Sequence, residues 1–138
     1  MKLAMYKGKG KIGNSIIRWW TKSEYSHCEI LIDGYCYSSS LMDGGIRKKI
    51  INLDSNKWDL IDLSNFSKSQ VLEYFERTQG NKYGWLDLLV NQLFNKSDNR
   101  SKSEFCSEWV AAALGLPDPV IYSPKTLNNL IIWVNNKG

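Results

Sequence analysis

The spacing of apolar residues changes near the middle of this chain of 138 residues. Up to about residue 63, apolar and polar residues alternate in short segments, which is the period-2 pattern of strands. Beyond that point, apolar residues recur every three to four positions, as they do in helices. Strands first and helices afterwards are typical of an α+β domain. We therefore expect an α+β fold in which an antiparallel sheet packs against helices.

The individual elements follow from turn and cap signals. Strands are predicted at Leu3–Tyr6, Ser26–Ile32, Tyr35–Ser40, Ile46–Ile51 and Trp58–Leu63, with Asp33-Gly34 as a two-residue hairpin turn. Helices are predicted for 14–20, for 67–80 with Ser67 and Gln70 as a capping box, for 85–93, for 105–115 and from Ser123-Pro124 through Leu130. Residues 95–103 are polar and are expected to form an exposed loop.

Size and composition limit the classes of protein. A mass of 15.9 kDa fits one domain, 1–138. The longest apolar run is far short of the roughly 20 residues that cross a bilayer. The first residues become charged before an apolar stretch forms, so we expect no transmembrane segment and no secretory signal.

The net charge of +4 is concentrated in the first 50 residues, which hold nine Lys or Arg against four Asp or Glu. A basic edge of this kind is able to meet nucleic acid or another anionic polymer. Zinc-finger spacing, RNA-binding aromatic signatures and basic helices are all missing from the sequence, however. A solvated face is the better interpretation, and nucleic acid is not an expected partner.

Cysteine and histidine content narrows the chemistry further. The three cysteines, Cys28, Cys36 and Cys106, are odd in number and show no repeated spacing, so reduced thiols are expected rather than a disulfide framework. With His27 as the single histidine, a His-rich metal site is impossible, and we expect neither a metal nor a cofactor. One Cys–His pairing is still available.

His27 opens a predicted strand, so His27, Glu29 and Leu31 share one face of it. A turn at 33–34 places Glu29 opposite Ser38 and His27 opposite Ser40 in the hairpin. A carboxylate or a hydroxyl beside an imidazole fixes its tautomer and stabilises its charged form. The alternative is a histidine without a chemical role in a half-polar strand.

Cys106 is placed differently from the other cysteines. It falls in the first turn of the predicted helix 105–115, where free N–H groups and the helix dipole lower a thiol pKa. Its helical neighbours Trp109, Val110 and Ala113 form an apolar stripe that should pack on the sheet and carry the thiol toward it. The alternative is a small buried hydrophobic residue. Cys28, which points away from the His27 face, and Cys36 are interpreted as packing residues.

Four segments together resemble a known family: Thr21–Glu29, Ser38–Ser40, Gly44–Arg47 and Phe105–Glu108 ahead of an Ala-rich helix. They are similar to the circularly permuted papain-like hydrolases of the NlpC-like superfamily, which are common in bacteria and phages. In the ordinary order the cysteine precedes the histidine, whereas here His27 comes first, as in the permuted branch. The resemblance extends from about Tyr6 to about Leu130.

The resemblance implies a thiol hydrolase with a permuted papain-like fold. Cys106 would be the nucleophile, with its backbone N–H in the oxyanion hole, and His27 the general base and then acid. Permuted relatives often take the third residue from the following strand, which favours Ser38 or Ser40, but we predict Glu29, the carboxylate on the His27 face. Tyr25 would cover the cleft or donate to the oxyanion.

Family members act on peptidoglycan stem peptides, on other amides or on lipid esters. The basic first third and the six tryptophans suit an anionic, carbohydrate-bearing polymer, so the predicted substrate is a cell-wall amide bond. The alternatives are a thioesterase or acyltransferase on acyl substrates and a catalytically inactive interaction protein on the same scaffold. The expected location is the cytoplasm of a bacterial or phage-infected cell, or the virion.

Overall fold

The computed structural model describes residues 1–8, 24–40, 43–79 and 102–137. Its strands are β1 (Lys2–Tyr6), β2 (His27–Ile32), β3 (Tyr35–Ser40), β4 (Gly45–Lys49) and β5 (Trp58–Asp62). Its helices are α2 (Lys68–Thr78), α4 (Lys102–Ala113), the short 3-10 helix η1 (Pro119–Ile121) and α5 (Pro124–Lys137). The helices predicted at 14–20 and 85–93 lie outside the described residues. The predicted α+β class with an antiparallel sheet is confirmed.

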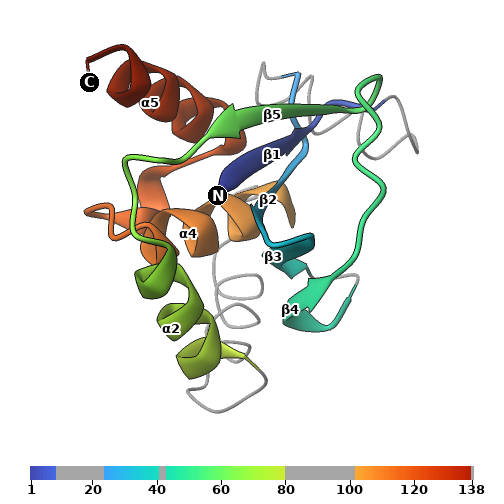
Figure 1. The fold of residues 1–138 in the computed structure, drawn as a ribbon, viewed down its shortest axis with the longest axis vertical. Coiled ribbons are helices and arrows are strands. Elements are labelled where there is room, and N and C mark those ends of the chain that lie inside the picture. Colours follow the sequence, from blue (N-terminus) through green and yellow to red (C-terminus); the bar gives the residue numbers. More distant parts are fainter. Residues whose placement is uncertain (9–23, 41–42, 80–101, 138) are drawn as a thin grey trace, which may run out of the picture.

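The five strands form one antiparallel sheet in the order β4-β3-β2-β1-β5 (Figure 1). Asp33 and Gly34 both have positive φ, 49° and 85°, as the predicted tight hairpin turn requires. The turn pairs Ile32 with Tyr35, as expected, and the ladder continues to Ile30 and Tyr37. β1 inserts between β2 and β5, which makes β2 an interior strand with partners on both sides.

One face of the sheet is covered by α4, which contacts β2 and β3 (Figure 1). α5 contacts α4 and β5 and lies above α4 in this view, whereas α2 packs against α4 from below (Figure 1). Trp109, Val110, Ala113 and Leu114 are buried together with Ile30, so the predicted apolar stripe on this helix is confirmed. This packing fixes the position of Cys106 relative to β2.

α2 and α5 begin directly after Ser67 and Ser123, the residues whose capping signals predicted these starts. The Ser67 hydroxyl accepts a hydrogen bond from the Gln70 N–H at 3.2 Å. The Gln70 side chain does not complete a capping box, because it donates to the Ala113 carbonyl at 3.2 Å and so ties α2 to α4. Ser123 caps α5 through the Thr126 N–H, but α5 continues for 14 residues, beyond the predicted end at Leu130.

The predicted start of the helix that carries Cys106 is wrong. α4 begins at Lys102, inside the segment expected to be an exposed loop, and Cys106 is its fifth residue. Only the first four N–H groups of an α-helix lack an intrahelical acceptor. The Cys106 N–H is therefore committed to the helix.

Candidate active site

β2 positions a histidine and a carboxylate on the same side, two residues apart. His27 Nε2 donates to Glu29 Oε2 at 2.9 Å. Glu29 is fully buried, whereas one quarter of the His27 side chain is exposed, so His27 is the member of this pair that reaches the surface. The alternation of side chains along the strand produces this contact, as the sequence predicted.

Arg47 of β4 binds the other oxygen of the same carboxylate. Its Nη1 donates to Glu29 Oε1, and its Nε donates to Asp43 Oδ2 at 2.8 Å. Lys49 also donates to Asp43 Oδ2, at 2.8 Å. A chain of hydrogen bonds thus links His27, Glu29, Arg47 and Asp43. All four side chains are charged when the imidazole is protonated.

These contacts keep the Glu29 carboxylate ionised in a buried position. Burial by itself raises the pKa of Glu29, but the hydrogen bonds and positive charges of His27 and Arg47 outweigh it and lower this pKa. The hydrogen bonds from Lys49 and Arg47 lower the pKa of Asp43 to about 2. Both carboxylates therefore carry a negative charge at neutral pH.

Cys106 lies on the helix side of β2 and is fully buried. Its sulfur accepts a hydrogen bond from the thiol of Cys28, with the two Sγ atoms 3.5 Å apart. The interaction of the Cys106 thiol with the His27 ring lowers the pKa of Cys106 and raises that of His27. The structure thus brings together all three residues predicted for the site.

The electrostatics favour a thiolate at Cys106 and an imidazolium at His27. Burial raises the pKa of Cys106, but the hydrogen bond from Cys28 and the charge and hydrogen bond of His27 bring it down to about 5. Burial lowers the pKa of His27, but the charge of Cys106 and its hydrogen bond, followed by those of Glu29, raise it to about 10. Between pH values of about 5 and about 10, Cys106 and His27 therefore form a thiolate–imidazolium ion pair.

Cys28 packs in the core, as predicted, and it also contacts Cys106. Its side chain does point to the helix-covered face, as the alternation predicted, but that is the face from which Cys106 approaches. Burial, followed by the hydrogen bond and negative charge of Cys106, raises the pKa of Cys28 well above its usual value. Cys28 is therefore a neutral thiol that donates to its ionised neighbour.

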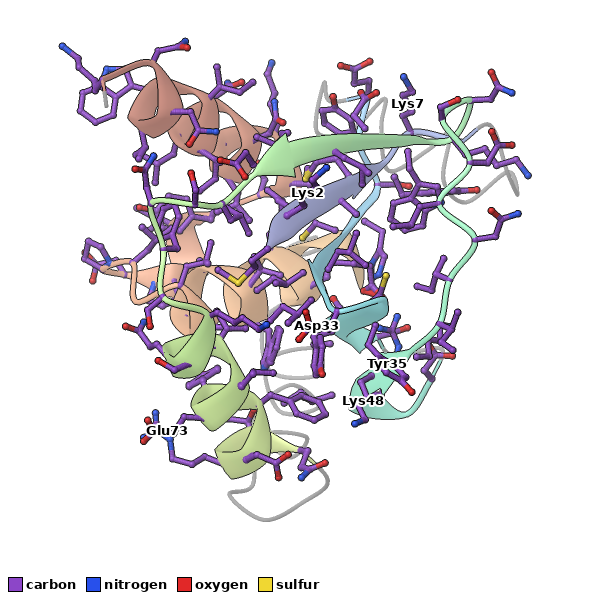
Figure 2. All side chains as sticks on the ribbon, in the orientation of Figure 1. Lys2, Lys7, Asp33, Tyr35, Lys48 and Glu73 are labelled. Carbon is purple, nitrogen blue, oxygen red and sulfur yellow. The ribbon has the colours of Figure 1, made fainter. Side chains whose placement is uncertain are left out.

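Two of the alternatives for supporting residues have other partners. The Ser38 hydroxyl, one alternative for the third residue, donates to the Cys28 carbonyl at 2.8 Å. The Tyr25 hydroxyl donates to Asp59 Oδ2 at 2.6 Å, and Lys7, labelled in Figure 2, donates to Asp59 Oδ1 at 2.7 Å. The Tyr25 hydroxyl is thus hydrogen-bonded to Asp59, which argues against the expected donation to an oxyanion.

The dipole and oxyanion arguments for Cys106 also need correction. Because α4 begins one turn earlier than predicted, the free N–H groups of its first turn precede Cys106. The helix terminus is therefore not the source of the low thiol pKa, and the Cys106 N–H is not a free oxyanion donor. His27 and Cys28 lower the pKa instead.

Arg47, Asp43 and Cys28 are site residues for which the sequence predicted no chemical role. Arg47 appeared only within the Gly44–Arg47 segment of the family resemblance. Arg47 pairs with Ser38 across β3 and β4, and this register places its side chain beside Glu29.

Within the part of the chain that the structure describes, no group of three His, Cys, Asp or Glu is arranged to hold a metal ion. In the same residues, no helix has the length and apolar character of a membrane span. No protein-family model, curated protein or solved structure matches this chain, so its function has to be inferred from the site itself.

Proposed function

We propose that this protein is a cysteine hydrolase with a permuted papain-like fold, in which Cys106 is the nucleophile. The observation that carries the proposal is the Cys106–His27 pair, with Glu29 hydrogen-bonded to the His27 ring. A nucleophile, a base and a residue that orients the base are the parts that thiol hydrolysis needs. A scaffold protein has no need for an ionised thiol beside a charged histidine.

The reaction begins with attack by the Cys106 thiolate on the carbonyl carbon of an amide, which forms a C–S bond and a tetrahedral oxyanion. His27 gives a ring proton to the amide nitrogen, the C–N bond breaks, and the amine leaves. Water then attacks the acyl-thioester while His27 accepts a proton, and the thiolate and a carboxylic acid are released. Glu29 keeps the imidazole in one orientation and balances its charge throughout.

Arg47 acts as a positioning residue. Its guanidinium holds one Glu29 oxygen, so that the other faces His27, and Asp43 fixes the guanidinium in turn. An isolated buried carboxylate would take up a proton rather than remain ionised. Arg47 thereby keeps Glu29 able to support the imidazolium.

Amide bonds in peptidoglycan stem peptides are the proposed substrate. The net charge of +4, concentrated in the first 50 residues, suits an anionic polymer of this kind. This support comes from composition, whereas the nucleophile assignment rests on the geometry of the pair. The two parts of the proposal can therefore fail separately.

The test incubates the full chain with purified peptidoglycan and identifies new amine and carboxyl ends by mass spectrometry. We expect cleavage by the wild type and a fall of about a thousandfold or more in Cys106→Ala and His27→Ala. Cys36→Ala, which also removes a buried thiol, is the matched control and should keep its activity. Equal cleavage by Cys106→Ala would overturn the hydrolase mechanism. Cleavage only of acyl esters or thioesters, dependent on Cys106, would overturn the substrate and keep the nucleophile.

A further inference from the structure

Two thiols from distant parts of the chain meet in the core. The Sγ atoms of Cys28 on β2 and Cys106 on α4 lie 3.5 Å apart, although the residues are separated by 78 positions. Both are reduced and fully buried. The mechanism proposed above uses Cys106 but does not require a second sulfur at this place.

We propose that Cys28 and Cys106 form an oxidative modification site, in which Cys28 captures the oxidised form of Cys106 as a reversible disulfide. A disulfide bond is about 2.05 Å long, so the sulfurs have to approach by about 1.5 Å. The packing of α4 on β2 already holds the two side chains face to face.

Cys36 is not a competing partner for this bond. It pairs with Leu31 across the hairpin, so its side chain lies on the Leu31 face of the sheet. Cys28 is three positions from Leu31 on β2, and alternation places it on the opposite face, toward α4. Cys28 is accordingly the thiol that contacts Cys106 in the structure.

The first chemical step needs a hydroperoxide as oxidant. The Cys106 thiolate attacks one peroxide oxygen, the O–O bond breaks, and an alcohol or water leaves with a proton from solvent. The sulfur loses two electrons and becomes a sulfenic acid. Hydrogen peroxide is scarcely larger than water, which suits a buried sulfur beside the partly exposed ring of His27.

The second step joins the two cysteines. The Cys28 sulfur attacks the sulfenic sulfur of Cys106, an S–S bond forms, and the hydroxyl leaves with the Cys28 proton as water. A dithiol reductant reverses the modification by exchange and restores both thiols. Without Cys28, the sulfenic acid remains exposed to a second peroxide, which converts it irreversibly to a sulfinic acid.

The experiment treats the full chain with limiting hydrogen peroxide and maps the cysteine peptides by mass spectrometry before and after a dithiol reductant. In the wild type we expect a cross-linked Cys28–Cys106 peptide that disappears on reduction. In Cys28→Ala we expect labelling of Cys106 by a sulfenic-acid reagent and sulfinic acid formation about tenfold faster. Cys36→Ala is the matched control and should form the cross-link like the wild type.

Titration of His27, the single histidine, by NMR gives a second measurement. Disulfide formation removes the negative charge of Cys106, so the pKa of His27 should fall in the oxidised wild type and return on reduction. A cross-link through Cys36, or sulfinic acid formation at the same rate in the wild type and in folded Cys28→Ala, would overturn the proposal. None of these measurements uses hydrolysis, so a protein without hydrolase activity would still pass or fail them.

Discussion

Cys106 and Cys36 occupy equally buried positions, with no exposed surface, yet their thiols behave in opposite ways. Burial raises the pKa of Cys36 to about 11, with the negative charge of Glu29 adding to it. At Cys106 burial is outweighed by Cys28 and His27, and the pKa falls to about 5. Arg47, Lys49 and a backbone hydrogen bond at Ile51 lower the pKa of Cys36, but burial and Glu29 outweigh them. A buried thiol therefore ionises only where its donors and cations outweigh burial, as they do at Cys106.

Glu29 acts in opposite directions at the two sites. It disfavours a thiolate at Cys36 directly, through its charge. At Cys106 it favours a thiolate indirectly, because it stabilises the His27 imidazolium that faces the sulfur. The charge of this one buried carboxylate thus helps to keep the Cys36 thiol neutral and the Cys106 thiol ionised.

The largest expected effect comes from His27→Ala, which removes the cation beside Cys106. At pH 7 a thiol with a pKa near 5 is almost fully ionised, whereas one with a pKa of 9 or more is about one per cent ionised. Alkylation of Cys106 by iodoacetamide should therefore fall about a hundredfold, toward the rate of Cys36. Mass mapping of the modified cysteines over time measures both rates in one sample.

The pH profile of the same reaction checks the cause. In the wild type the alkylation rate should rise with pH through about 5 and then level off, because deprotonation of Cys106 is complete there. In His27→Ala the rise should move to the alkaline side of the usual thiol pKa of about 8.5. An unchanged profile in that variant would show that the difference between Cys106 and Cys36 does not depend on His27.

A smaller effect is expected from Arg47→Met, which removes one cation from Glu29 and leaves His27 in place. The pKa of Glu29 should rise, because burial is then opposed by fewer favourable interactions. A carboxyl group with a lowered native pKa stabilises the fold above its unfolded pKa of about 4.3, and this contribution disappears as pH falls through the native pKa. Acid unfolding should therefore begin at higher pH, with about 3 kcal/mol lost at neutral pH.

Circular dichroism along an acid titration measures this change, and Arg47→Lys should recover part of it. Asp43→Asn is the matched control, because it removes a partly exposed partner of Arg47 and leaves the Arg47–Glu29 contact intact. It should cost less than about 1 kcal/mol. An equal loss in both variants would mean that Arg47 acts through packing and not through Glu29.

Local signals in the sequence were sufficient for the sheet and for one part of the site. Asp33-Gly34 predicted the turn, and the turn determined the register of β2 and β3. Alternation along β2 then placed His27 and Glu29 on one face, where they form a hydrogen bond. Each of these inferences depends only on residues close together in the chain.

The missed features depend on contacts between distant segments. Arg47 reaches Glu29 because β4 pairs with β3. The chain enters β4 through Gly44 and Gly45, which both have positive φ, and composition alone does not determine the geometry of that turn. The role of Cys28 follows from the way α4 crosses β2. The polar residues ahead of Cys106 are typical of a loop, so the earlier start of α4 was not predicted either.

The smallest expected effect is that of Cys36→Ala. The substitution removes one buried sulfur from β3 and leaves His27, Cys28 and Cys106 untouched, so the alkylation rate of Cys106 should change less than about twofold. Loss of the buried sulfur should cost about 1 kcal/mol in the free energy of unfolding, measured by urea denaturation. A tenfold change in the Cys106 rate without a larger loss of stability would mean that the two thiols are coupled across the sheet. Their opposite pKa values would then belong to one network, and Cys36 would no longer serve as an independent reference for a buried neutral thiol.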